Sequence, residues 1–216
     1  MPVRRIGLCY RSVSGRVPMG GGRRTVAVES TLERDFALLQ RFDRDVVGLE
    51  EQPVRISYRD AAGAKRSYVP DFLVTYRQGV PKLVEVKFST DPALVGGELE
   101  PRFAAARTYS AARGWSFHLA TEAHIRTPRL GNATFLLPFR QRPADSALRA
   151  RILLAIQARP RTVEWLTATV STDAGCDRAQ VLPNLWGMVA RFELVADLDR
   201  PLTMRSHLKL PNGGLS

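Results

Sequence analysis

The sequence predicts an α/β fold with helices on the faces of a mixed sheet, followed by a smaller winged-helix-like α domain. Three observations lead to this prediction. A helix-periodic segment precedes several short apolar runs, and a second helical segment then leads into a further strand-like run. Consecutive strands that are later joined through a helix favour a mixed sheet. A break rich in Pro, Arg and Asp at 138–146 separates this part from three short helical segments.

The chain begins with a basic region and a predicted helix. Residues 1–24 combine Arg, Gly, Ser and Pro, which predicts a loose basic arm able to follow a DNA backbone or to remain a solvated tail. The stretch ESTLERDFALLQRFD at 29–43 predicts a helix with Ser30 as its N-cap. Its apolar residues recur at helical spacing: Leu32, Phe36, Leu39 and Phe42.

The next part of the chain predicts strands. VVGLEEQPVRISY reads as two extended pieces around Gln52 and Pro53, and the turn signal DAAGAKRS predicts that 54–59 and 65–69 pair as a hairpin. DFLVTY and KLVEVKF predict two further strands separated by the turn RQGVP. An Ala- and Arg-rich helix ending near Gly114 then leads to a predicted strand at 116–125, in which His118 is expected to be a core residue.

The C-terminal part predicts a helical domain. The segments ALRARILLAIQARP, TVEWLTATV and DRAQVLPNLWGMVARFEL read as three helices, and 195–210 as a small hairpin. This is the outline of a winged helix-turn-helix, with Trp165 and Trp186 expected as core anchors. The predicted organisation is therefore a basic arm at 1–24, an α/β domain at 25–140 and a winged-helix-like domain at 145–216.

Composition points to a polyanionic partner. Lys and Arg number 32 against 21 Asp and Glu, for a net charge of +11, which favours nucleic acid over a merely basic surface or an acidic protein partner. The two cysteines are far apart and predict neither a disulfide framework nor a zinc site. Without a long apolar run, a membrane span is not expected, and a cytoplasmic location is the default.

Charged residues stand within the apolar stretch YVPDFLVTYRQGVPKLVEVKF at 68–88. Because strand side chains alternate, Glu85 and Lys87 share one face, while Val84, Val86 and Phe88 are expected to point into a core. Asp71 begins the neighbouring strand, directly after a proline that enforces an extended entry. If the two strands pair, Asp71 and Glu85 approach each other at one end of the sheet.

This arrangement predicts metal-assisted phosphodiester hydrolysis. Two close carboxylates repel each other, and a divalent cation such as Mg²⁺ relieves that repulsion while it also binds phosphate oxygens. Lys87 is placed to hold an attacking water or to meet a phosphate charge. Pro-Asp followed by Glu-x-Lys is the nuclease pattern PD-(D/E)xK, and the alternative is an exposed hairpin face with a Glu85–Lys87 surface pair.

Two readings compete for Glu33, which lies three residues after Ser30. The two residues match a capping box, in which the glutamate satisfies helix N-terminal donors. Glu33 is also positioned to supply a third carboxylate from a helix beside the sheet. Farther along, Arg102, Arg107 and Arg113 do not all share one helix face, so some are expected to meet phosphate and others solvent.

Residues 15–125 resemble the TnsA endonuclease subunit of heteromeric transposases. The resemblance lies in the S-x-L-E helix opening, the E-x-Q-P element, YVPDFLV and LVEVK. It implies a restriction-endonuclease-like PD-(D/E)xK core with a catalytic set of Glu33, Asp71, Glu85 and Lys87. Glu33, Asp71 and Glu85 would bind Mg²⁺, for which Mn²⁺ can substitute. Gln52 is expected near the site, without an assigned role.

The resemblance also implies a biological setting. TnsA-type subunits nick the 5′ ends of transposon DNA, while a DDE transposase, TnsB, cuts and joins the 3′ ends, and an AAA+ regulator, TnsC, contacts the C-terminal domain. Such systems include CRISPR-associated transposons and work at the nucleoid in the bacterial cytoplasm. Two alternatives remain open: a stand-alone restriction or repair nuclease, and a catalytically silent DNA-binding assembly subunit.

Overall fold

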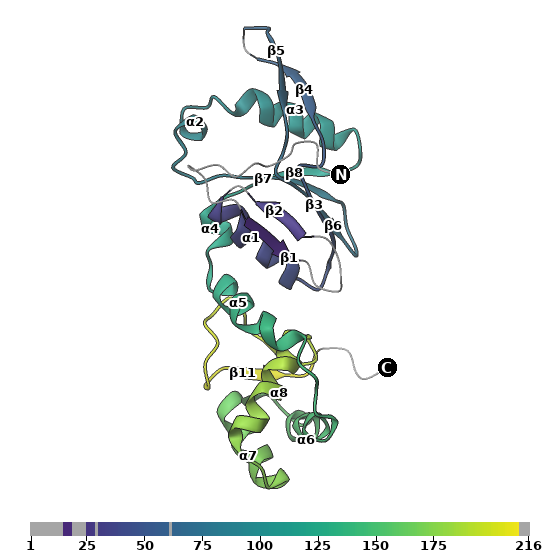
Figure 1. Cartoon of the computed structure of the whole chain (residues 1–216), viewed down its shortest axis with the longest axis vertical. Helices are drawn as coiled ribbons and strands as arrows, with labels where there is room; N and C mark the ends of the chain where they lie inside the picture. Colours follow the sequence, from purple (N-terminus) through teal and green to yellow (C-terminus); the bar gives the residue numbers. More distant parts are fainter. Residues whose placement is uncertain (1–14, 19–24, 29, 61, 212–216) are drawn as a thin grey trace. The chain divides into compact units, whose positions relative to one another are not determined.

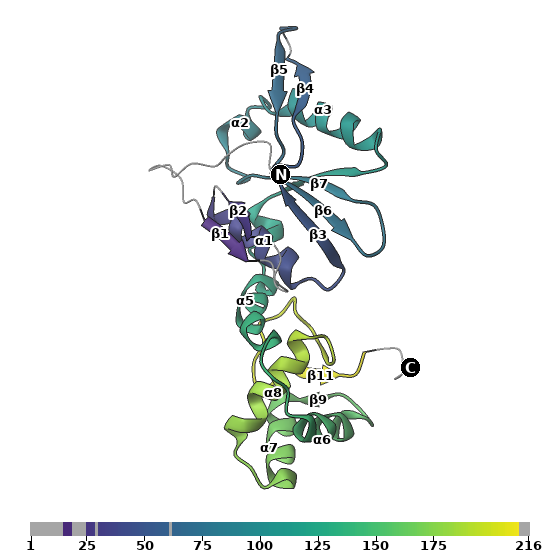
Figure 2. The same ribbon diagram turned by 45° about the vertical axis from the view of Figure 1, so that its right-hand side comes forward.

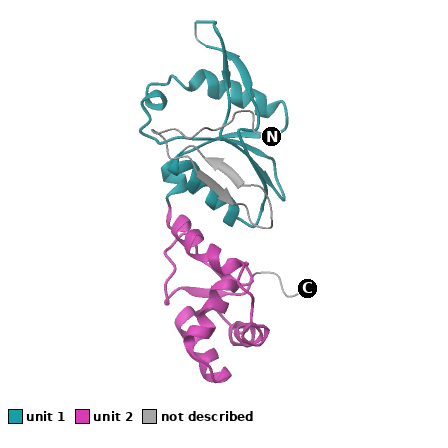
Figure 3. Cartoon of the chain, in the orientation of Figure 1, with its two compact units in different colours: residues 1–126 teal, residues 127–216 magenta. Residues whose placement is uncertain are grey.

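The computed structural model describes residues 15–18, 25–28, 30–60 and 62–211. The chain divides into two compact units, Met1–Arg126 and Thr127–Ser216, which are distinguished by colour in Figure 3. Most of the predicted basic arm at 1–24 lies outside the described residues. Within it, Gly15–Pro18 forms strand β1, which pairs antiparallel with β2 (Thr25–Val28).

The first unit alternates helices with short strands (Figure 1). After β2, its elements are α1 (Thr31–Phe42), β3 (Val46–Glu51), β4 (Ile56–Arg59), β5 (Lys65–Tyr68), β6 (Phe72–Tyr76), β7 (Lys82–Val86), α2 (Pro92–Val95), α3 (Glu100–Ala111), β8 (Ser116–Ala120) and α4 (Glu122–Ile125). These bounds confirm the predicted first helix, the hairpin, the two strands that follow it and the Ala-rich helix.

A mixed sheet forms the centre of the first unit. In the described residues it has four strands in the order β3-β6-β7-β8. The β3–β6 and β6–β7 pairs are antiparallel, whereas β7–β8 is parallel because α3 carries the chain back across the sheet. The predicted mixed α/β class is therefore confirmed. Hairpin β4–β5 pairs separately, with Ile56 opposite Tyr68 at its base.

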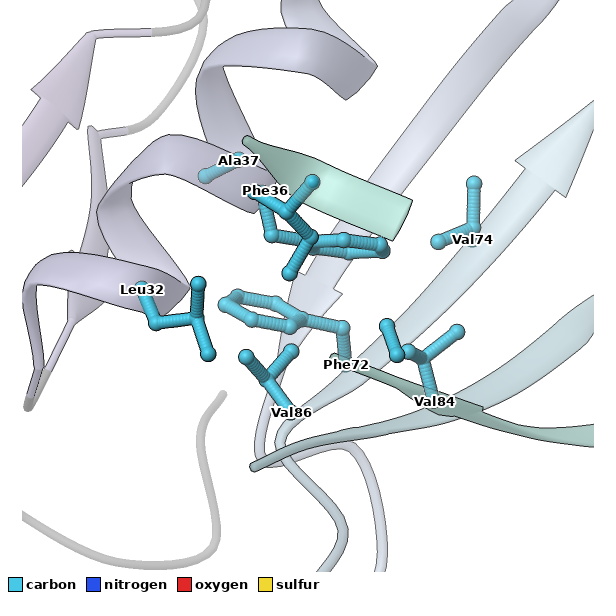
Figure 4. Packing of buried hydrophobic residues seen from close by; sticks show 9 residues of the cluster. Leu32, Phe36, Ala37, Phe72, Val74, Val84 and Val86 are labelled. Atoms are coloured by element: carbon cyan, nitrogen blue, oxygen red, sulfur yellow. The ribbon is translucent and has the colours of Figure 1, made fainter. Parts of the chain in front are cut away.

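Helix α1 covers one face of this sheet. Its N-cap is Ser30, whose hydroxyl accepts a hydrogen bond from the Glu33 backbone N–H at 3.1 Å. The Phe36 ring of α1 stacks on Phe72 of β6 with ring centres 5.2 Å apart (Figure 4). The remaining buried members of this core cluster come from α1, the sheet and α4: Leu32, Ala37, Val74, Val84, Val86, Ala120 and Ile125.

Helix α3 and the base of the hairpin cover the opposite face. Because strand side chains alternate, Leu73 and Leu83 point away from α1 and join a second core cluster with Ala106 of α3. Ile56 and Tyr68, from the base of the hairpin, complete the buried members of this cluster. Glu85 has the same parity as Leu83 and therefore lies on the α3 face of the sheet.

The second unit is mainly helical. Its elements are α5 (Pro128–Arg140), α6 (Ser146–Ile156), β9 (Arg161–Thr162), α7 (Val163–Ala174), α8 (Arg178–Ala190), β10 (Val195–Ala196) and β11 (His207–Lys209). The short strands pair in the order β10-β11-β9. The three predicted C-terminal helices are present as α6, α7 and α8, and the winged-helix class of this unit stays a prediction.

Two expectations differ from the observed elements. The predicted strand at 116–125 ends at Ala120, because Thr121 caps α4, with its side chain accepting from the N3 backbone. The expected domain limits at 140 and 145 differ from the observed division after Arg126. Helix α5 belongs to the second unit because Asn132 is buried and its amide group donates to the carbonyls of Leu198 and Arg200.

Among the helices of the described residues, none is both long and apolar enough to cross a bilayer.

Candidate active site

Three of the predicted site residues meet at one end of the four-stranded sheet, where β6 begins and β7 ends. The register pairs Phe72 with Val84, so its continuation by one residue sets Asp71 opposite Glu85. The Val86 backbone N–H donates to Asp71 Oδ2 at 2.7 Å, which ties the start of one strand to the end of the other. The pairing of two neighbouring strands therefore brings both carboxylates to one edge.

Glu85 is 2% exposed and makes contacts through both carboxylate oxygens. Its Oε2 accepts a hydrogen bond from the Tyr68 hydroxyl at 2.7 Å. Its Oε1 lies 3.4 Å from Lys87 Nζ and 3.3 Å from Arg102 Nη2. A buried carboxylate is costly unless it is paired and hydrogen-bonded, and these three groups meet that requirement.

Asp71 is half-buried beside these groups. Burial raises the pKa of Asp71 well above its usual range, and the negative charges of Glu85 and Glu33 raise it further. The Lys87 ammonium and the Val86 N–H act in the opposite direction without cancelling this effect. A further cation beside Asp71 would favour its ionised form.

Lys87 stays charged in this environment. Burial by itself lowers the pKa of Lys87, but the charges of Glu85 and Asp71 and the hydrogen bond to Glu85 outweigh it, so the pKa is raised. An amine with a raised pKa is an ammonium at neutral pH. In the described site Lys87 is thus a hydrogen-bond donor and a positive charge, not a proton acceptor.

Glu33 lies in the first turn of α1, where its two predicted roles overlap. The Ser30 hydroxyl donates to Glu33 Oε1 at 3.0 Å, which holds the side chain at the helix N-terminus. The charge of Glu33 nevertheless raises the pKa of Asp71, so it acts electrostatically on the site. The neighbouring acid Asp35 has a structural role, because it is buried between Arg34 at 2.9 Å and Arg126 at 3.2 Å.

Tyr68 and Arg102 join the site although the sequence did not single out either for contact with Glu85. Burial and then the charge of Glu85 raise the pKa of Tyr68, which keeps its hydroxyl protonated as a donor. The Arg102 guanidinium lies 5.3 Å from the centre of the Tyr68 ring. Its Nε is buried and has no hydrogen-bond partner in the part of the chain that the structure describes.

The two additions differ in how visible they are in the sequence. Tyr68 precedes the Pro-Asp pair by one residue, which is a local signal. No spacing rule connects Arg102 to Glu85, because α3 must first pack on the sheet. The other arginines of α3 have different surroundings: Arg107 pairs with Glu100, and Arg113 lies over the Tyr109 ring at 3.6 Å.

Gln52, at the end of β3, also lies at this edge. Its backbone N–H donates to the Asp71 carbonyl at 2.8 Å, and its side chain is largely buried. Its φ of 45° is in the left-handed region, which is uncommon for a residue other than glycine. The expectation that Gln52 lies near the site agrees with this contact.

The oxygen donors at this sheet edge suit the predicted Mg²⁺ ion. Mg²⁺ is often held by one or two carboxylates together with waters and substrate phosphate oxygens, so the oxygen donors of Asp71 and Glu85 fit this ion. Among the residues that the structure describes, no three His, Cys, Asp or Glu side chains are grouped closely enough to hold a metal. The three-carboxylate set that includes Glu33 is thus not gathered here, and metal ligation by these residues stays a prediction.

Three aromatic residues are more exposed to solvent than the sequence predicts. Phe88 is 39% exposed because β7 ends at Val86, and the side-chain alternation of the strand does not extend to it. His118 is exposed on β8, an edge strand of the sheet, rather than buried in the core. Trp165 is 37% exposed beneath the Arg161 guanidinium, whereas Trp186 is buried as predicted.

Part of the chain matches a known protein family. Residues 43–122 match the family model described as TnsA-like endonuclease N terminal. The matched span contains Asp71, Glu85 and Lys87, together with Tyr68 and Arg102, and it begins after Glu33. The comparison with curated proteins found no match to the chain.

Proposed function

We propose that this chain is the metal-dependent endonuclease that nicks the 5′ ends of a transposon during cut-and-paste transposition, because residues 43–122 match the TnsA-like endonuclease N-terminal model. The observation that carries the proposal is the meeting of Asp71, Glu85 and Lys87 at the shared end of β6 and β7. Two carboxylates and an amine at one sheet edge suit hydrolysis of a phosphodiester.

Asp71 and Glu85 are the proposed ligands of the metal, with Glu33 adding negative charge from α1. When bound, Mg²⁺ supplies a lower pKa to a coordinated water and positive charge beside the phosphate, and Mn²⁺ can take its place. The backbone N–H of Val86 orients Asp71 at 2.7 Å. The Tyr68 hydroxyl donates to Glu85 Oε2 at 2.7 Å and orients that carboxylate.

Lys87 and Arg102 are the proposed phosphate-facing cations. Both lie at Glu85 Oε1, where they balance the charge of this carboxylate. Their positive charges beside the carboxylate would also stabilise the negative charge that develops on a scissile phosphate during hydrolysis. Arg102 suits this role because its guanidinium already has an unmet buried donor.

The second unit has the proposed role of contacting partners. As a winged-helix-like domain, it would bind a TnsC-like AAA+ regulator or DNA. A separate TnsB-like DDE transposase would cut and join the 3′ ends. The substrate is transposon-end DNA in the bacterial cytoplasm, at the nucleoid. CRISPR-associated transposons are one class of element in which such a subunit would serve.

Strand-resolved transposition assays test this function. Asp71→Ala and the isosteric Asp71→Asn are compared with Asp45→Ala, which removes an exposed carboxylate close to the opposite end of the same sheet. We expect both Asp71 variants to lose 5′-strand nicking while 3′ joining by the transposase continues, and Asp45→Ala to retain both.

The same assay separates the alternatives. A stand-alone nuclease would cut DNA equally well with and without the DDE transposase. A silent assembly subunit would give unchanged strand products when Asp71 is replaced, and that result would exclude the proposed chemistry.

A further inference from the structure

Hairpin β4–β5 has two unlike faces. Strand alternation places Ile56, Tyr58 and Tyr68 on one face, and all three pack in the cluster around α3. The other face presents only donor side chains that are all exposed: Arg55, Ser57, Arg59, Lys65 and Ser67. Figures 1 and 2 show the turn end of the hairpin extending beyond α3 and away from the four-stranded sheet.

The exposed face carries three cations and two hydroxyls, with no carboxylate and no large apolar side chain among them. The single acid of the hairpin, Asp60, sits in the turn, where it pairs with Arg66 at 2.8 Å. Within the face, Arg55 Nη1 donates to Ser67 Oγ at 3.2 Å, and Arg59 Nη1 donates to the Gly63 carbonyl at 2.7 Å. Solvent-exposed bonds of this kind are weak and exchange readily for phosphate oxygens.

This chemistry selects one kind of partner. Arg, Lys and Ser side chains are the usual donors to the phosphate oxygens of DNA. A protein partner would need buried aromatic or apolar anchors, and this face offers none. An anionic membrane would likewise favour apolar residues beside the cations. The face therefore fits a nucleic-acid backbone.

The hairpin is also joined directly to the site. Tyr68 is the last residue of β5, and its hydroxyl donates to Glu85 on the side of the hairpin that packs on α3. An isolated two-stranded hairpin is marginally stable, so the packing of Ile56, Tyr58 and Tyr68 against α3 is what holds the donor face in place. A nucleic-acid backbone that binds along this face is thereby held at a fixed position relative to Glu85.

We propose that the donor face of hairpin β4–β5, formed by Arg55, Ser57, Arg59, Lys65 and Ser67, binds the phosphate backbone of the duplex that the neighbouring site cuts. The identity of this duplex as DNA rests on the proposed function. The surface positions the duplex without reading its sequence, because phosphate contacts carry no base information.

The salt dependence of DNA binding tests the proposal. The full chain, without divalent metal, is titrated with labelled duplex DNA over a series of salt concentrations. Each phosphate contact contributes about 0.9 to the slope of log K against log salt. Replacing Arg55, Arg59 and Lys65 by Gln is expected to reduce the slope by about 2.7, for three lost contacts. Ser57→Lys, which adds a cation to the same face, is expected to steepen it by about 0.9.

A matched triple variant controls for net charge. Like the hairpin set, the control set has two arginines and one lysine, all exposed. They are Arg44, Arg77 and Lys82, at the end of the sheet opposite the site. The control variant with these three residues replaced by Gln should show the same slope of log K against log salt as the parent chain. Melting curves check that each variant folds.

Three results would overturn the proposal: a parent chain that does not bind duplex DNA, a hairpin triple variant with the parent slope, or equal losses in both triple variants. Nicking is measured separately. A parent chain that binds through the hairpin and never nicks contradicts the proposed function alone, whereas a nicking chain with an unaltered hairpin-variant slope contradicts this proposal alone.

Discussion

Replacing Arg102 by Gln should strengthen metal binding and slow nicking at the same time. Arg102 Nη2 and Lys87 Nζ both lie beside Glu85 Oε1, at 3.3 and 3.4 Å. A metal that binds Glu85 must therefore compete with two positive charges that are already present. When the arginine charge is removed, Tyr68 and Lys87 still hold the Glu85 carboxylate in place. The metal then competes with one positive charge for Glu85 instead of two.

The distances set the scale of this effect. Two unit charges 3.3 Å apart interact by about 5 kcal/mol at an effective dielectric constant of 20, before desolvation is subtracted. The Arg102 side chain is 25% exposed and its Nε already lacks a partner within the described residues, so the net interaction is well below this limit. A gain of about 1.4 kcal/mol corresponds to tenfold tighter metal binding, and we expect this order of change.

Titration calorimetry with Mn²⁺ in the absence of DNA measures the binding, and single-turnover nicking at saturating metal measures the rate. Arg107→Gln is the matched control, because Arg107 lies on the same helix and pairs with Glu100 instead of Glu85. We expect Arg102→Gln to bind Mn²⁺ about tenfold more tightly and to nick about tenfold or more slowly, since one cation no longer reaches the phosphate. Arg107→Gln should change neither quantity.

Mn²⁺ affinity that is unchanged or weaker in Arg102→Gln would refute this reasoning, because it would mean that Arg102 and the metal do not compete for Glu85. Unchanged nicking combined with tighter binding would refute only the phosphate-facing role of Arg102. Melting curves of the two variants separate both outcomes from a loss of folding.

Three further predictions concern residues around the site and the core. Tyr68→Phe removes a buried hydrogen bond to the charged Glu85, so chemical denaturation should show a loss of about 1.5–3 kcal/mol and nicking should slow; equal stability would mean that the bond adds nothing. Because the pKa of Asp71 is raised on folding, the folded chain binds its proton more tightly than the unfolded chain does. In the absence of metal, the free energy of unfolding should therefore fall as pH rises from about 3.9 to the raised pKa, and it should fall less in Asp71→Asn, as denaturation at several pH values would measure. Phe72→Ala removes the ring stacked on Phe36 and should cost about 3–5 kcal/mol in the same assay, and a loss below 1 kcal/mol would contradict the described packing.

Local patterns predicted much of the fold. Helix α1 has its N-cap and apolar spacing written in consecutive residues, and the hairpin has a turn signal between two strand-like runs, so both could be placed from the sequence. Helix α4 was missed because a four-residue helix directly after a strand has no periodicity of its own. The exposure of His118 was missed because β8 is an edge strand, and strand order is a property of the folded sheet.

The sequence by itself determined the pair of acids and the lysine, since Pro-Asp and Glu-x-Lys stand in two adjacent strands whose alternation fixes a common face. Only the tertiary structure decided which other groups hold them. The hydroxyl of Tyr68 meets Glu85 from a separate hairpin, and the guanidinium of Arg102 meets it from α3. The physical reason is that register and side-chain alternation act over a few residues, whereas contacts with Glu85 from outside its strand depend on how hairpin and helix pack on the sheet.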